Sequence, residues 1–134
     1  SGNFGGVAIG ADDSFVICQL GTNDRGKATS APQGPTTFRE NLETLLGQLE
    51  GFAPTILMCA NPTTDFDPSI MSMKMDEIRS VIRAVARGEG VDFIDNYAAF
   101  DGYDLSAVLA DGLHPNRQGH AIIARNIIGA LEGT

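Results

Sequence analysis

The chain is organised around one stretch, Asp111-Gly112-Leu113-His114-Pro115-Asn116-Arg117-Gln118-Gly119-His120, which an apolar helical pattern follows. The stretch places an aspartate and a histidine three residues apart on a short loop restrained by glycine and proline. An imidazole can act as a general base near neutral pH because its ordinary pKa is about 6.5. A neighbouring carboxylate fixes the tautomer of the ring and stabilises the imidazolium that forms. The loop alone allows two interpretations, a catalytic Asp111–His114 pair or a turn that merely carries a surface histidine.

The size and charge of the chain limit what surrounds this loop. The chain has 134 residues, of which 43% are hydrophobic, so we expect residues 1–134 to form a single domain with its own core. Its net charge of −8, from 17 acidic and 9 basic residues, disfavours a nucleic-acid surface, which needs clustered Lys and Arg. No apolar run reaches the roughly 18 residues of a membrane-spanning helix, so we expect no membrane span.

Several familiar sites are missing from the sequence. Cys18 and Cys59 lie in apolar runs of two predicted neighbouring strands, where a free cysteine behaves as a small hydrophobic residue. No Cys/His cluster has zinc spacing, and no glycine-rich loop matches a dinucleotide or phosphate fingerprint. The Gly-x-Ser-x-Gly motif of ordinary α/β-hydrolases is also absent. We therefore expect no metal and no cofactor.

Strand-like and helix-like patterns alternate along the chain. Short apolar runs predict strands over residues 15–20, 55–60 and 91–95. Helical spacing predicts helices from Thr36 or Thr37 to about Gly51, over residues 72–87 and over residues 121–131, with one helical turn at 105–110. Thr37 and Glu40 have the spacing of a capping box for the first of these helices. The β-α-β-α-β-α order predicts an α/β fold with a parallel sheet and right-handed crossovers.

Polar side chains follow each predicted strand. Asn23 follows the first strand, Asn61 the second, and Asp111 and His114 come after the third. Ligands of open parallel sheets bind outside the carboxyl ends of the strands, so these residues should meet at one edge. The Asn23 amide could donate to a developing oxyanion, a contribution worth roughly 3–4 kcal/mol of barrier. Asn61 has two interpretations, contact with a substrate or a turn-forming role before Pro62.

Two motifs carry a resemblance to a known family. Gly21-Thr22-Asn23-Asp24, directly after an apolar strand, resembles the third conserved block of the SGNH hydrolases, the GDSL esterases and lipases. Asp111-Gly112-Leu113-His114-Pro115-Asn116, with Gly119-His120 and an apolar helix after it, resembles the fifth block. The resemblance extends from residue 15 to about residue 131, nearly the whole chain.

The resemblance implies a fold, an activity and three roles. The fold is a flavodoxin-like parallel sheet with helices on both faces. The family hydrolyses esters, often acyl or acetyl groups on lipids or carbohydrates, without a metal or cofactor. By this resemblance Asn23 is an oxyanion donor, His114 is the general base and Asp111 is the carboxylate that orients it. A small-molecule or glycan ester is the implied substrate.

The chain departs from the family pattern at its beginning. That fold normally opens with a strand ending in Gly-Asp-Ser, which carries the nucleophile, and a second block supplies an oxyanion glycine. Only 22 residues precede Asn23, so neither block fits. We therefore expect this chain to be the C-terminal portion of such a domain. An N-terminal segment or companion chain would carry the serine and pair with the open edge of strand 15–20.

The serines of the chain itself offer weaker nucleophiles. Ser14 precedes its strand and so lies at the wrong edge, whereas Ser30 follows that strand and is the best internal candidate. Ser69 and Ser72 follow the second strand and are weaker still. If no serine approaches His114, the rival hypothesis is a non-catalytic module with a degenerate fold, either carbohydrate-binding or structural. We interpret four loop carboxylates as solvated groups and not as a metal site: Asp65, Asp67, Asp101 and Asp104.

Overall fold

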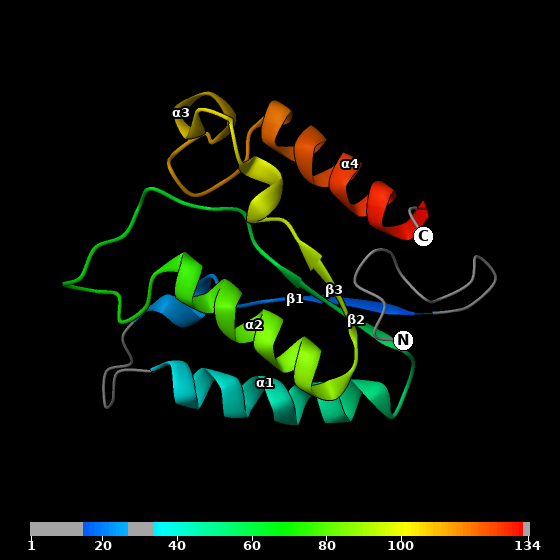
Figure 1. Ribbon diagram of the computed structural model, residues 1–134. Helices are drawn as coiled ribbons and strands as arrows, with labels where there is room; N and C mark the ends of the chain where they lie inside the picture. The colour runs from blue at the N-terminus through cyan, green and yellow to red at the C-terminus, as the bar shows by residue number, and fades with distance from the viewer. Residues whose placement is uncertain (1–14, 27–33, 133–134) are drawn as a thin grey trace.

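The computed structural model describes residues 15–26 and 34–132, and these form a three-stranded parallel sheet with helices on both faces (Figure 1). The strands are β1 (Val16–Gln19), β2 (Thr55–Cys59) and β3 (Asp92–Asp95), in the order β1-β2-β3. Helix α1 (Pro35–Glu50) joins β1 to β2, and helix α2 (Met75–Glu89) joins β2 to β3. The predicted α/β class and parallel sheet are confirmed.

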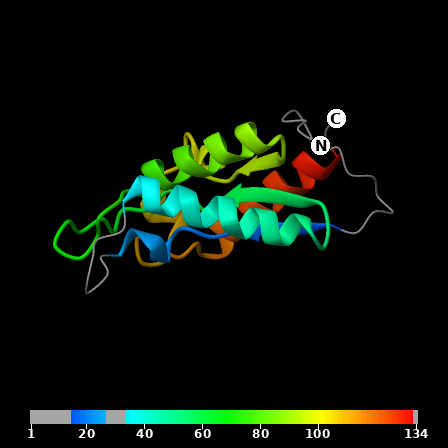
Figure 2. The same cartoon turned by 90° about the horizontal axis from the view of Figure 1, so that it is seen from below.

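Two hydrophobic clusters hold the layers together. On one face, α1 and α2 pack against β2 through a large cluster that includes Phe38, Leu42, Leu57, Ile78 and Ile82. On the other face, helix α4 (Arg117–Glu132) covers β2 and β3 through a smaller cluster. Figures 1 and 2 show α1 and α2 together on one side of the sheet and α4 on the other. Burial of both sheet faces explains why the central strand β2 is buried along its whole length and is apolar from Ile56 to Cys59.

The helix boundaries differ from those predicted. Helix α1 begins at Pro35 after Gly34, without a side-chain cap, so the Thr37–Glu40 capping box is wrong. Proline at the first helical position presets the backbone and needs no N–H, so the helix starts before the threonines. Helix α2 begins at Met75, three residues later than expected, and ends at Glu89, where Gly90 caps it with a φ of +67°.

The connection from β3 to α4 is folded into short helical pieces. It contains a 3-10 turn at Ala98–Phe100 and the helix α3 (Leu105–Val108), close to the turn that we predicted at 105–110. Phe100, Val108 and Ile122 of α4 are buried together in a third cluster. This packing fixes the start of α4, which begins at Arg117, four residues earlier than predicted, and so includes His120.

Strand β1 forms one edge of the sheet and β3 the other. The β1 side chains are half-buried, apart from Gln19, which is exposed. The companion strand that we expect beside β1 stays a prediction. Cys18 on β1 and Cys59 on β2 are free thiols, as expected, and burial raises the pKa of Cys59 to about 12. Among the described residues, no helix has the length and apolar character needed to cross a membrane.

Candidate active site

The turn after β1 exposes Asn23 at the carboxyl edge of the sheet. Gly21 has a φ of +116°, and a Cβ on it would lie 2.5 Å from Cγ2 of Ile78 and 3.3 Å from Cζ of Phe38. Only glycine therefore lets the chain pass this close to α1 and α2. The backbone then enters a 3-10 turn at Asn23–Arg25, closed by a 3.1 Å hydrogen bond from the Asp24 N–H to the Gly21 carbonyl. The exposed Asn23 side chain is left available for a ligand.

The Asp111–His114 loop brings the predicted pair together. The Asp111 Oδ2 atom lies 2.7 Å from Nδ1 of His114. The other oxygen, Oδ1, accepts the backbone N–H groups of Leu113 at 3.0 Å and His114 at 2.7 Å. The carboxylate thus holds the loop backbone and the imidazole at once. With a proton on Nδ1 facing Asp111, Nε2 is the acceptor that a general base requires.

These contacts keep Asp111 charged. The backbone N–H of His114, the imidazole and the backbone N–H of Leu113, in that order, lower the pKa of Asp111 to about 2. Both side chains are exposed, His114 to 71% and Asp111 to 54%, so a substrate or another polypeptide segment can reach the ring. The charge of the carboxylate favours the imidazolium that forms when His114 accepts a proton.

Gly112 and the loop backbone set the position of the histidine. Gly112 has a φ of +80°, and a Cβ on it would lie 2.6 Å from Oγ1 of Thr64 in the loop after β2. The Gly112 carbonyl accepts the Thr64 N–H at 2.8 Å, and the Ala110 N–H donates to the His114 carbonyl at 2.7 Å. The His114 loop is therefore closed by a hydrogen bond between its own residues, and it also contacts the loop that follows β2.

Asn116 and Gly119 explain the remainder of the motif. The Asn116 side chain caps α4, because its Oδ1 accepts the Gly119 N–H at 3.0 Å, and its Nδ2 donates to the Ala107 carbonyl at 2.8 Å. A Cβ on Gly119 would collide with the Val108 carbonyl. Because Gly119 has no side chain and Asn116 bonds to the Ala107 carbonyl, the start of α4 contacts α3 directly. This contact fixes the end of the His114 loop.

Of the two interpretations of Asn61, contact with a substrate or a turn-forming role, its hydrogen bonds favour the second. It is buried, and its Nδ2 donates to the Pro62 carbonyl at 2.9 Å and to the Leu113 carbonyl at 3.2 Å. It therefore supports the backbone next to His114. Asn23, Asp111 and His114 all follow the carboxyl ends of strands, as predicted, and in the described part of the chain no hydrogen bond joins Asn23 to His114 directly.

The buried Arg25 and the partly exposed Asp65 form an ion pair that the sequence did not predict. Arg25 is 2% exposed, and its Nη1 and Nη2 atoms lie 2.8 and 3.1 Å from the two Asp65 carboxylate oxygens. The Arg25 hydrogen bonds lower the pKa of Asp65. The interpretation of Asp65 as a solvated carboxylate is therefore wrong, because a buried guanidinium needs a charged partner. The sequence feature that could have indicated this pair is that Arg25 follows β1 and Asp65 follows the neighbouring strand β2.

Of the four serines in the described ranges, Ser69, Ser72 and Ser106 donate their hydroxyls to groups other than His114. The Ser69 hydroxyl donates to Asp67 Oδ1 at 2.7 Å, and the Ser72 hydroxyl donates to the Arg25 carbonyl at 3.4 Å. Ser14 and Ser30 lie outside the described residues. Over residues 15–26 and 34–132, no group of three or more His, Cys, Asp and Glu side chains could hold a metal ion.

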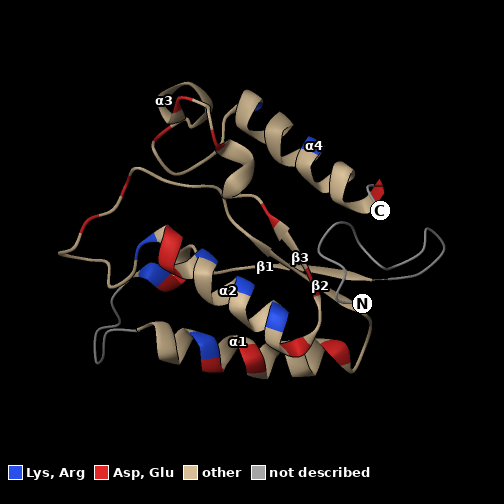
Figure 3. Ribbon diagram, viewed as in Figure 1, with Lys and Arg blue, Asp and Glu red and all other residues tan. Residues whose placement is uncertain are grey.

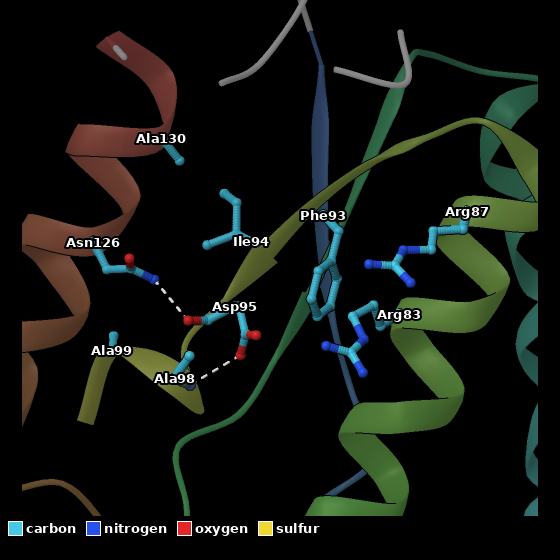
Figure 4. Close-up of a pocket in the computed structure, with 9 residues that line it drawn as sticks. All are labelled: Arg83, Arg87, Phe93, Ile94, Asp95, Ala98, Ala99, Asn126 and Ala130. Carbon is cyan, nitrogen blue, oxygen red and sulfur yellow. Dashed lines mark hydrogen bonds between the residues drawn. The ribbon is translucent and has the colours of Figure 1, made fainter. Parts of the chain in front are cut away.

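Two hollows show where a ligand could enter. One of about 290 Å³ is lined by the chain from Gln19 to Asp24 and so includes Asn23. Another of about 500 Å³ lies along the outer edge of β3 between α2 and α4, and its lining includes Arg83, Arg87 and Asn126 (Figure 4). Within it, Asn126 donates to the Asp95 carbonyl at 3.2 Å, which ties α4 to β3. None of the predicted site residues lines the larger hollow, and of the three only Asn23 lines the smaller one.

Comparison with known families and curated proteins identifies relatives of this chain. The model of the GDSL-like lipase/acylhydrolase family matches residues 2–122. A GDSL lipase of Mycobacterium tuberculosis is 31% identical over 123 residues, which are 90% of this chain and 51% of that protein. An acetylxylan esterase of Xylanibacter ruminicola is 29% identical over 147 residues, with 93% of this chain and 30% of that protein covered. The chain spans about half or less of the length of these relatives.

Solved structures share the fold. An acetylxylan esterase from Geobacillus stearothermophilus matches with a TM-score of 0.73 at 22% identity, covering 90% of this chain and 60% of that one. An α/β hydrolase from the metagenome of Lake Arreo in Spain matches with a TM-score of 0.69 at 25% identity, covering 87% and 58%. These similarities confirm the arrangement of sheet and helices.

Proposed function

Because the chain belongs to the GDSL-like lipase/acylhydrolase family, we propose that it supplies the catalytic His114 and Asp111 and the oxyanion donor Asn23 of a serine-type ester hydrolase. The observation that carries the proposal is the 2.7 Å contact between Asp111 Oδ2 and His114 Nδ1. That contact leaves Nε2 of an exposed imidazole as the acceptor. The arrangement suits acyl transfer and requires neither a metal nor a cofactor.

The proposed reaction has two acyl-transfer steps. A serine hydroxyl attacks the ester carbonyl, its proton passes to Nε2 of His114, and the carbonyl electron pair becomes an oxyanion to which the Asn23 amide donates. The tetrahedral intermediate collapses, the ester C–O bond breaks, and His114 returns the proton to the departing alkoxide. Water then repeats the sequence on the acyl-enzyme, releasing the acid and restoring the serine. Throughout, Asp111 stabilises the imidazolium and holds its orientation.

The nucleophilic serine is proposed to come from outside this chain, on an N-terminal segment or a companion chain. Two observations support this. The relatives are longer than this chain, and β1 lies at the edge of the sheet, where a further strand can pair. A strand added beside β1 would end next to the hollow formed by residues 19–24, and so beside Asn23.

We propose a carbohydrate ester, most simply an acetyl ester, as the substrate class. One curated relative and one structural neighbour are acetylxylan esterases by name. The candidate site is also polar and exposed, and the chain carries a net charge of −8, which suits a soluble polar substrate better than a bilayer.

Acetate release from acetylated xylo-oligosaccharides tests the proposal. The assay compares this chain, the longest natural form of the protein that contains it, and the His114→Ala variant of that form. We expect hydrolysis by the natural form and none by its variant. Hydrolysis that persists in His114→Ala would overturn the assignment. Binding of the oligosaccharide without hydrolysis in any form would favour the non-catalytic carbohydrate-binding module.

A further inference from the structure

The side chain of Arg25 connects two loops at the carboxyl edge of the sheet. Its Nε atom donates to the Thr22 carbonyl at 3.0 Å, which closes the turn that carries Asn23. Its Nη1 atom also donates to Thr63 Oγ1 at 3.1 Å, beside the paired hydrogen bonds to Asp65. One buried guanidinium therefore holds both the turn after β1 and the loop after β2.

The loop between β2 and α2, residues 61–74, winds around Arg25. Its first limb supplies Thr63 and Asp65, and its second limb supplies Ser72, whose N–H donates to the Arg25 carbonyl at 2.7 Å. Gly26 and Met71 form an isolated antiparallel bridge next to this contact. Figure 3 shows acidic positions along this loop and a basic position in the turn after β1. The loop and the turn thus form one packed unit.

The same loop contacts the His114 loop on its other side. The Thr64 N–H, from the residue between Thr63 and Asp65, donates to the Gly112 carbonyl at 2.8 Å. The Asn61 amide donates to the Leu113 carbonyl at 3.2 Å. A continuous path of hydrogen bonds therefore runs from the Asn23 turn through residues 61–65 to the backbone that precedes His114.

The charge of Arg25 makes this path rigid. A buried charge that loses its partner carries a large desolvation cost, so the guanidinium and the Asp65 carboxylate must stay together. The paired hydrogen bonds fix both the distance and the angle between the guanidinium and the carboxylate. A neutral hydrogen bond at the same place would permit more movement of the turn relative to the loop.

We propose that Arg25 is a positioning residue that sets Asn23 relative to His114 through the loop of residues 61–74. Its catalytic meaning rests on the function proposed above, whereas the coupling between the loops does not. Catalytic groups must be held within fractions of an ångström by the contacts behind them, and Arg25 supplies such a contact between the two halves of the site.

Amide hydrogen exchange of this chain tests the coupling directly. The variant Asp65→Asn keeps the shape of the side chain and removes its charge, and the control Glu43→Gln breaks the exposed Arg39–Glu43 pair at 3.8 Å. We expect Asp65→Asn to accelerate exchange of the Thr64 and Asp24 amides about tenfold, and to leave Leu57 in the core unchanged. The control should alter none of the three.

Two results would overturn the coupling. One is faster exchange confined to residues 63–65, which would mean that the turn after β1 does not depend on the pair. The other is equal acceleration throughout the sheet, which would mean that the pair contributes only to global stability. Asp65→Asn suits this experiment because it changes the contact from its more exposed side: the side chain of Asp65 is 21% exposed and that of Arg25 is 3% exposed.

Steady-state kinetics tests the catalytic consequence in whichever natural form hydrolyses the ester. We expect Arg25→Lys to lower kcat about tenfold or more with KM within about twofold, because the positions of groups in the transition state change more than substrate binding. Added to Asn23→Ala, it should cause no further loss, and Arg39→Lys is the matched control. Independent, multiplying losses would overturn the positioning role. If no form hydrolyses the ester, the proposed function fails, and the exchange experiment still decides the coupling.

Discussion

The two carboxylate oxygens of Asp111 contact different parts of His114: Oδ2 lies 2.7 Å from the ring Nδ1, and Oδ1 accepts the backbone N–H of the same residue at 2.7 Å. The side chain therefore orients the imidazole and shapes the loop that carries it. Losing its charge and losing its position have different consequences, and substitutions can separate the two.

Asp111→Asn should retain the loop and lose most of the activity of the hydrolytic form. An amide nitrogen facing Nδ1 donates a hydrogen bond, so the ring proton moves to Nε2 and the base is blocked. In another enzyme with this arrangement the same change lowers kcat about ten-thousand-fold. We expect a loss of several hundredfold or more in kcat/KM, against an unchanged value for Asp101→Asn, an exposed aspartate of the β3–α4 connection. Activity near that of the unchanged protein would remove Asp111 from the mechanism.

His114→Ala should abolish turnover without unfolding the domain. The side chain is 71% exposed, so its loss removes little buried surface. We expect the Tm to change by no more than a few degrees. His120→Ala, at an exposed position in α4, is the control and should retain full activity. Unfolding of His114→Ala would show that the loop has a structural role that the geometry does not reveal.

The Asp111 contacts should survive to unusually low pH. The folded pKa of about 2 lies below the ordinary value of about 3.9, so the carboxylate binds its proton less readily in the folded loop. Its stabilising contribution is complete above pH 4 and is lost as the pH falls through about 2. Titration of the Leu113 and His114 amide resonances should show a midpoint near 2. A midpoint near 4 would mean that these hydrogen bonds do not favour the ionised form.

Gly21→Ala should destabilise the domain, and Gly47→Ala provides a matched control. At Gly21 a Cβ meets Ile78 at 2.5 Å, and the φ of +116° disfavours any other residue. We expect a loss of about 1–3 kcal/mol in the free energy of unfolding in urea. Gly47 lies inside α1 with nothing within 4 Å of its Cβ position, so alanine there should stabilise by about 0.5–1 kcal/mol. Equal effects at both positions would contradict the close approach of the turn to α2.

Local patterns predicted the parts of the structure that depend on local physics. The apolar runs located β1, β2 and β3 to within a residue or two, since strands buried on both faces require them. The Asp111–His114 pair was predictable because both partners lie on one loop, three residues apart. The order of strands and helices then placed Asn23 at the same edge without knowledge of any contact.

Contacts between distant segments were not predictable in the same way. Arg25 and Asp65 are 40 residues apart, and nothing near either residue signals that one is buried and the other is its partner. Helix boundaries also depended on such contacts. Helix α4 starts earlier than predicted because Asn116 caps it, a local signal that the prediction did not use, and because Gly119 lets its first turn pack against α3.

Fluorophosphonate labelling, read by intact mass and peptide mapping on every polypeptide present, tests the central claim most directly. We predict one phosphonyl group on a serine outside residues 1–134, and loss of that label in His114→Ala. A label on Ser30 would keep the chemistry and place the nucleophile within this chain. Absence of any label on the longest natural form, or a label that persists in His114→Ala, would contradict the claim that this chain supplies the base of an ester hydrolase.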